Sequence, residues 1–137
     1  MFPERTSVGL DVHARSVVAA AIDGVTGEVF KARSTPDFQD VLRWVRGLPG
    51  PVAATYEAGP TGFGLYRART GAGMRCEVAA PSKRQRPSGD RVKTDQRDAL
   101  RLARLLRLDE VTSVTVPSLD QEAARDLVRL GRMLAVT

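Results

Sequence analysis

Hydrophobic and polar residues alternate over the first quarter of the chain in the pattern of short β-strands. Residues 8–12 place their apolar side chains on one face, and residues 16–22 form a second run rich in β-forming residues. A turn-forming stretch at 23–27 separates this run from a returning strand at 28–33. The pattern predicts three antiparallel strands in a meander.

Helical spacing replaces the alternation after this meander. The apolar residues of 38–45 recur every three or four positions, after a proline-containing start at 35–37 and before a stop at 47–51. Beyond that helix we predict a buried strand at 52–56 that ends at Glu57, a helix to about residue 70 with Thr61 as its N-cap, and a strand at 74–79.

The C-terminal part of the chain begins with a polar, basic loop at 81–93. A strongly amphipathic helix at 95–108 and an extended segment at 111–116 follow it. Ser118 to Gln121 matches a capping box, which predicts a further helix that runs to the last residue without a stop signal. We therefore expect a fragment in which residues 1–116 form one α/β domain and residues 117–137 begin a further, longer helix.

The order of these elements decides between the α/β layouts. Antiparallel strands at the N-terminus exclude a purely parallel, doubly wound sheet. A meander followed by alternating helices and strands matches the RNase H-like layout, in which helices flank a mixed five-stranded sheet. We therefore predict an RNase H-like fold.

Positive charge is concentrated in one stretch, although the formal net charge of the whole chain is only +5. Residues 82–107 hold nine basic and three acidic residues, a net +6, so the remainder carries −1. A basic stripe on a near-neutral body is typical of polyanion-binding proteins, with a solvated helix face as the ordinary alternative. The candidate nucleic-acid-binding residues in this stretch are Lys83, Arg84, Arg86, Arg91 and Lys93.

Composition disfavours several classes of protein. The longest apolar runs are too short to cross a bilayer and the first residues lack the features of a signal peptide, so we expect no membrane association. A single cysteine, Cys76, excludes an internal disulfide and fits a reducing cytoplasm. A single histidine, His13, makes a zinc site built by this chain alone improbable.

Four acidic residues stand where the predicted elements would bring them to one edge of the sheet. Asp11 is late in the first strand and Glu57 ends the fourth, so in a parallel pair both lie near the carboxyl edge, where open α/β sheets bind ligands. Asp95 and Asp98, three residues apart, share one face at the start of the third helix. That face continues with Leu102, Leu105 and Leu106, while Arg97, Arg101 and Arg104 are expected to point outward.

Carboxylates gathered in one place repel each other unless cations neutralise them. Oxygen ligands favour Mg²⁺ or Mn²⁺, and two such ions about 4 Å apart could activate an attacking oxygen and stabilise the leaving oxygen at a phosphodiester. Asp11, Glu57, Asp95 and Asp98 are therefore the candidate metal-binding and catalytic residues. Each has an ordinary alternative: N-capping for Asp95, a dipole contact for Asp98, and a solvated strand end for Glu57. For His13, packing or hydrogen bonding is favoured over ligation.

Three segments around these acids resemble the signature blocks of the DEDD transposases, the Piv/MooV-type recombinases of insertion sequences. The segments are residues 8–14, 56–62 and 93–99, and the resemblance extends from about residue 7 to residue 108. Asp11, Glu57, Asp95 and Asp98 fall on the four acidic positions of that family. The resemblance implies a RuvC-like N-terminal catalytic domain that binds divalent metal and acts in DNA cleavage and strand transfer.

The resemblance also implies features that lie beyond this chain. Family members carry a C-terminal domain with a serine thought to attack DNA, so the fragment alone is expected not to be fully active. A coiled-coil segment joins the two domains of family members, and residues 117–137 resemble the start of this helical linker. The segment helps the subunits assemble, which implies a homo-oligomer, dimer or tetramer, in the full-length protein. Some members are guided by a structured RNA, which makes a guide RNA a candidate partner beside DNA. A bacterial, nucleoid-associated location in the cytoplasm fits this role.

Three other functions remain open on the sequence alone. An actin-like or sugar-kinase-type ATPase half-domain also begins with an Asp-bearing strand and a hairpin, but residues 12–15 lack the glycine and hydroxyl residues of its phosphate loop. A stand-alone Holliday-junction resolvase-like nuclease would share the metal site and need no partner domain. A non-catalytic nucleic-acid-binding module would depend on the basic residues and not on the acids.

Overall fold

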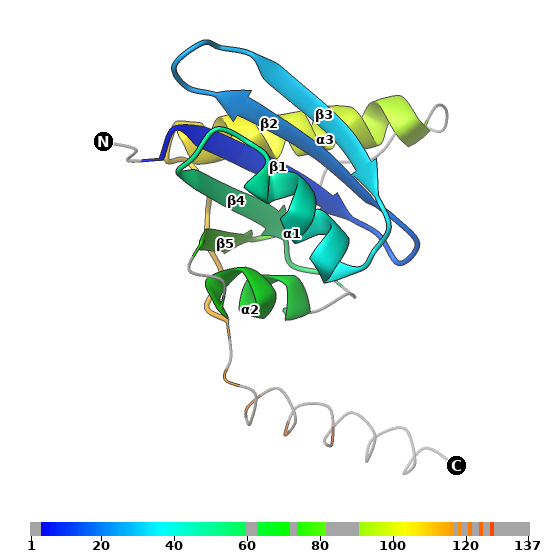
Figure 1. Ribbon diagram of the computed structural model, residues 1–137. Helices are drawn as coiled ribbons and strands as arrows, with labels where there is room; N and C mark the ends of the chain where they lie inside the picture. Colours follow the sequence, from blue (N-terminus) through cyan, green and yellow to red (C-terminus); the bar gives the residue numbers. More distant parts are fainter. Residues whose placement is uncertain are drawn as a thin grey trace.

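All eight predicted strands and helices up to residue 108 are present in the computed structural model (Figure 1). It describes residues 4–59, 63–71, 74–81 and 91–116 and the single positions 118, 121, 124 and 127. The strands are β1 (Thr6–Val12), β2 (Val17–Asp23), β3 (Val29–Ser34), β4 (Val52–Glu57) and β5 (Arg75–Ala79). The helices are α1 (Phe38–Arg46), α2 (Gly64–Gly71) and α3 (Arg91–Arg107).

The five strands form one mixed sheet in the order β3-β2-β1-β4-β5. The first three strands pair antiparallel, as the predicted meander, whereas β4 lies parallel to β1 and β5 parallel to β4. The register pairs Leu10 with Tyr56, so Asp11 and Glu57 come next, side by side at the carboxyl edge. This topology with its flanking helices confirms the RNase H-like prediction.

Helices cover both faces of the sheet (Figure 1). On one face, α1 and α2 cover the larger part of the core, where Leu10 and Tyr56 of the strands belong to the same buried cluster as Leu65 of α2. On the other face lies α3, whose Leu102 and Leu106 are buried as predicted. Within the described ranges, no helix combines the length and the apolarity that a membrane span requires.

The approach of α3 to β1 is close because Gly9 has no side chain. A methyl group at Gly9 would overlap the carbonyl oxygen of Ala99 and lie 2.7 Å from the amide nitrogen of Ala103. Both alanines are fully buried, so three small residues bring the backbones of helix and strand together. This contact holds the middle of α3, just after Asp98, against the strand that bears Asp11.

Local sequence fixes both ends of α1. The Asp37 side chain caps the helix by accepting a hydrogen bond of 2.7 Å from the Gln39 amide, and Gly47 is the C-cap. Among the apolar residues whose spacing predicted the helix, Val41, Leu42 and Val45 are buried and Phe38 is 37% exposed. The start predicted at 35–37 is therefore confirmed at the residue that supplies the cap.

The third helix begins four residues before its predicted start. Because α3 starts at Arg91 rather than at Asp95, the predicted basic loop does not extend to Lys93, and Asp95 is not an N-cap. Arginine and lysine are good helix formers, so the lack of an apolar period there did not signal a loop. The side chains of Arg91 and Lys93, and the whole of Lys83, Arg84 and Arg86, lie outside the described part of the chain.

The segment predicted to be extended at 111–116 lies along the outer edge of the sheet. The Val114 amide donates to the Val78 carbonyl at 2.8 Å, and the Ala80 amide donates to the Thr112 carbonyl at 2.7 Å. Ser113 also forms an antiparallel bridge with β5. These contacts place residues 110–112 beside the carboxyl end of β5, next to the edge that carries Glu57.

The capping box predicted at Ser118 is confirmed by two reciprocal hydrogen bonds. The Gln121 amide donates to the Ser118 hydroxyl at 3.2 Å, and the Ser118 amide donates to the Gln121 side-chain oxygen at 3.1 Å. Most of the helix predicted beyond this point, and the N-cap predicted at Thr61, lie outside the described residues. The domain boundary at residue 116 therefore stays a prediction.

Candidate metal centre

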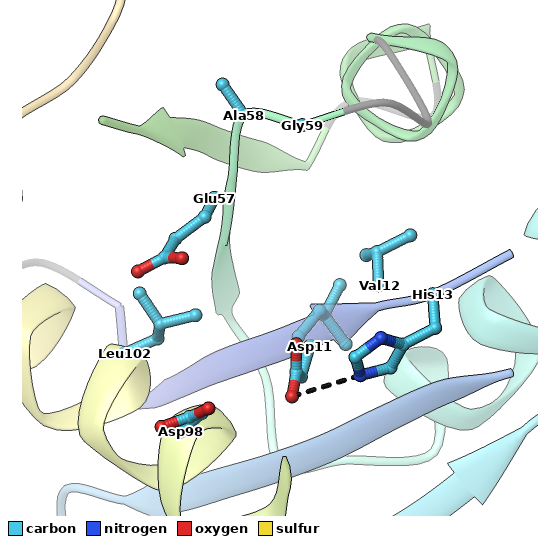
Figure 2. A pocket seen from close by; sticks show the side chains of 9 residues that line it. Asp11, Val12, His13, Glu57, Ala58, Gly59, Asp98 and Leu102 are labelled. Atoms are coloured by element: carbon cyan, nitrogen blue, oxygen red, sulfur yellow. Dashed lines mark ion pairs between the residues drawn. The ribbon is translucent and has the colours of Figure 1, made fainter. Parts of the chain in front are cut away.

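The carboxyl ends of β1 and β4 carry the first two predicted acids. Asp11 is the second-last residue of β1 and is only 9% exposed, and Glu57 is the last residue of β4. Alternate residues of a strand share a face, so Asp11 lies on the side of Gly9, which is the side that α3 covers. Figure 2 shows both side chains extending from the strands toward α3.

Asp11, His13 and Asp95 form the tightest group of candidate metal ligands in the described part of the chain. His13 Nε2 lies 3.2 Å from Asp11 Oδ2 and 3.5 Å from Asp95 Oδ2. One ligand atom of each residue lies within 4.8 Å of those of the other two. The strand therefore supplies a carboxylate and an imidazole, and the helix supplies the second carboxylate.

For His13 the sequence favoured packing or hydrogen bonding over ligation, and that choice stays a prediction. The structure places the imidazole within ion-pair distance of two acids. The β1–β2 hairpin positions the residue, since the His13 amide donates to the Ser16 carbonyl at 2.9 Å. Its place two residues after Asp11 puts both side chains on one face of an extended chain.

A cavity of about 230 Å³ opens beside this group. Asp11, His13, Glu57 and Asp98 line it, and its remaining wall is formed by Leu10, Val12, Ala58, Gly59 and Leu102 (Figure 2). The structure thus brings Asp11, Glu57 and Asp98 around one space, and Asp95 reaches the same place through its contact with His13. Acids from β1, β4 and α3 therefore lie around one site.

Glu57 has an arginine partner that sequence analysis placed on the outward face of the helix. Arg101 Nη2 donates to Glu57 Oε1 at 2.8 Å, and each side chain is 28% exposed. The outward prediction is wrong for Arg101, because it follows Asp98 by three positions and therefore shares its face of α3. Arg97 and Arg104 are exposed, as predicted.

The site has an excess of negative charge. Four carboxylates, those of Asp11, Glu57, Asp95 and Asp98, less the one guanidinium of Arg101, leave a formal charge of −3 with a neutral imidazole. Carboxylates that are held this close to one another favour the binding of a cation. The side chains of Asp11 and Asp95 are 11% and 16% exposed, so bulk water screens them only in part.

Known proteins match this chain over nearly its whole length. The family model of the DEDD transposases of the IS110 type, described as Transposase, matches residues 8–136, which include all four acids. "Putative transposase y4qE" of Sinorhizobium fredii is 46% identical over 127 residues, covering 89% of this chain and 33% of that protein. "Transposase for insertion sequence element IS1533" of Leptospira borgpetersenii is 33% identical over 127 residues, with 89% and 37% covered. The chain spans about a third of the length of these curated relatives.

Proposed function

Because the chain belongs to the DEDD transposases of the IS110 type, we propose that it is the metal-dependent catalytic domain of an insertion-sequence transposase. In this role it takes part in the cleavage and transfer of DNA strands. The observation that carries the proposal is the gathering of Asp11, His13 and Asp95 within 4.8 Å, beside a cavity that Glu57 and Asp98 also line. Family membership favours this function over an ATPase half-domain or a stand-alone resolvase-like nuclease.

The ligand set suits a divalent cation that prefers oxygen. Magnesium takes oxygen ligands, and manganese accepts both carboxylates and imidazole. We assign one ion to Asp11 and Asp95, with His13 within reach. We assign a second ion to Glu57 and Asp98, which line the same cavity as Asp11. A bound divalent ion would supply Lewis-acid polarisation of a phosphoryl oxygen and a lower pKa for the attacking group.

The protein's own residues prepare this site for a phosphodiester. The carboxylates are carried by two neighbouring strand ends and one packed helix, so their positions are set by the core rather than by a loop. Leu10, Val12 and Leu102 line the rest of the cavity and keep part of the water away, which strengthens electrostatic contacts inside it. We propose that Lys83, Arg84, Arg86, Arg91 and Lys93 contact the phosphates that flank the site.

Metal binding by the chain tests the first step of this proposal. Isothermal titration with Mn²⁺ should show an affinity that Asp11→Asn lowers by at least about 10-fold, because loss of a ligand costs at least as much as the 10–100-fold typical of outer-shell changes. Glu28→Gln is the matched control, because Glu28 is an exposed acid in the β2–β3 turn, at the far end of the sheet from Asp11. Equal affinities of Asp11→Asn and the wild type would rule the metal centre out.

Transposition by the full-length parent tests the catalytic assignment of each acid. Asp11→Asn, Glu57→Gln and Asp98→Asn should each abolish transposition in a plasmid assay. Their circular dichroism spectra should stay those of the wild type, because removing one of several repelling charges does not unfold the domain. A variant that transposes at the normal rate would remove that residue from the proposed role.

We propose that the remaining functions need the parts that the longer relatives contain. The matched relatives are about three times as long as the region shared with this chain. On this view residues 117–137 begin the linker to a C-terminal domain with the attacking serine, and the full-length protein assembles as a dimer or tetramer. A guide RNA is a candidate partner beside DNA. Size-exclusion chromatography with light scattering on the full-length protein would measure the assembly.

A further inference from the structure

A second cavity adjoins the candidate metal centre. Its volume is about 320 Å³, and Glu57, Arg101 and Leu102 line it together with the end of β5 and residues 110–112. Glu57 and Leu102 also line the first cavity, so they form the shared wall between the two. The volume is at the lower limit of small-ligand pockets, which suits one unit of a polymer better than a free ligand.

Arg101 distinguishes this second cavity from the first. It is the one permanent cation among the described residues that line either cavity. Within the described ranges its hydrogen bond to Glu57 Oε1 is made through Nη2, while its Nε is buried without a hydrogen-bond partner. A buried N–H with no acceptor is unfavourable, so the contact with Glu57 satisfies the guanidinium incompletely.

We propose that the second cavity takes a phosphodiester of the bound DNA strand, and that Arg101 there exchanges Glu57 for phosphate oxygens. The proposal rests on the proposed function, because DNA is the strand considered. Phosphate oxygens match the planar fork of a guanidinium and can accept from two of its N–H groups at once. A phosphate would therefore give Arg101 more acceptors than the single oxygen of Glu57 provides.

The charges around the two cavities support this division of roles. Asp11, Glu57 and Asp98 make the first cavity repulsive to a phosphate in the absence of cations. The second cavity is less negative, because Arg101 offsets the charge of Glu57 on the shared wall. Glu110 also lines the second cavity and opposes an anion, but it is exposed, so solvent and salt weaken its effect. Pro81 also lines the second cavity, and in the sequence it directly precedes the basic stretch at 82–107.

The exchange would connect strand binding with the metal centre. While Arg101 holds Oε1 of Glu57, that carboxylate is partly neutralised and one of its oxygens is engaged. When a phosphate replaces Glu57 as the hydrogen-bond partner of Arg101, the Glu57 carboxylate faces the first cavity with its full negative charge. The acid would thus become fully available for a cation once the strand is seated.

Binding of a short fluorescein-labelled oligothymidine in EDTA tests the phosphate contact without any metal. Arg101→Gln should weaken binding by about 10-fold and reduce the slope of log affinity against log salt by ~0.7, the value of one single-strand phosphate contact. Arg104→Gln is the matched control, because it removes the same charge from an exposed position of the same helix. Equal losses in the two variants would overturn the phosphate contact. Arg101→Lys, which keeps the charge without the fork, should lie between wild type and Arg101→Gln, and it replaces Arg101→Gln if that variant does not fold.

Titration with Mn²⁺ in the absence of DNA tests the exchange. Arg101→Gln should bind Mn²⁺ several-fold more tightly than Arg104→Gln, because it frees Glu57 and removes a positive charge beside the site. An affinity equal to or below that of Arg104→Gln would show that Arg101 only orients Glu57, and would overturn the exchange. Failure of the proposed function has a different signature, namely unchanged Mn²⁺ binding in Asp11→Asn.

Discussion

The substitution Gly9→Ala tests how the helix that carries two of the acids is held in place. The new methyl group would overlap the carbonyl oxygen of Ala99 and lie 2.7 Å from Ala103 N and 2.9 Å from the Ala99 carbonyl carbon. Favourable carbon contacts need about 3.5 Å, and all three atoms belong to the helix backbone, so α3 must move by about 1.5 Å to relieve the overlap with the Ala99 carbonyl oxygen. Overpacking of this kind costs about 1–3 kcal/mol, and the lack of a flexible side chain places Gly9→Ala at about 3 kcal/mol.

Two further quantities turn this cost into a measurement. Replacing glycine by alanine also restricts the unfolded chain, which returns about 0.5 kcal/mol, so the net loss of stability is about 2.5 kcal/mol. For a domain of this size, about 4 °C per kcal/mol gives a drop in Tm of roughly 10 °C in a thermal unfolding experiment. Because Asp98 directly precedes Ala99, the same shift should also lower the Mn²⁺ affinity.

A control glycine separates this effect from alanine substitution in general. Gly47 is the C-cap of α1 with φ −77°, and a methyl group there would lie 3.4 Å from its nearest neighbour, the Trp44 carbonyl oxygen. Gly47→Ala should therefore leave Tm unchanged or raise it slightly. The reasoning about α3 would be refuted if Gly9→Ala melted within about 2 °C of the wild type and bound Mn²⁺ equally well.

Two more predictions concern buried polar groups outside the candidate metal centre. Asp23, 2% exposed, accepts hydrogen bonds from Arg5 Nε at 3.0 Å and Nη2 at 2.8 Å, and these bonds hold the pKa of its carboxyl well below the usual value of about 4. A folded-state pKa below the unfolded one gives stability that is present above about pH 4 and is lost as the pH falls below it. The Tm difference between wild type and Asp23→Asn should therefore shrink in acid. A Tm difference that stays constant as the pH is lowered would contradict this. Thr55 and Thr6 are both fully buried, but in the described chain Thr55 Oγ1 has no hydrogen-bond partner, whereas the Thr6 hydroxyl donates to a backbone carbonyl. Thr55→Val should therefore raise the free energy of unfolding by about 1 kcal/mol in urea denaturation, and Thr6→Val should lower it by a similar amount; the same sign in both variants would be the contrary result.

The sequence predicted most of what depends on local pattern. Alternation identified the meander, and the turn and cap residues identified α1, because strand faces and helix starts are read from neighbours in the chain. The edge position of Asp11 and Glu57 followed from one further step, the parallel pairing of β1 with β4. That step was accessible because the long segment between the two strands includes the helix α1, and a long crossover is what parallel neighbours require.

The features that the sequence did not predict depend on contacts between distant segments. The ion pair of Arg101 with Glu57 joins residues 44 positions apart, and no local pattern specifies the partner of an arginine on a helix. The start of α3 at Arg91 was missed because a polar helix turn has the composition of a loop. The close packing at Gly9 depends on two alanines ninety or more positions away, which a single sequence does not connect.

Anomalous diffraction from crystals soaked in Mn²⁺ would test the metal centre most directly. The expected result is a peak about 2.1 Å from carboxylate oxygens of both Asp11 and Asp95, with Glu57 or Asp98 facing the same ion or a second one. The contrary result is the absence of a peak at this edge of the sheet in crystals that bind Mn²⁺ elsewhere. That outcome would leave a basic α/β domain whose acids serve another purpose.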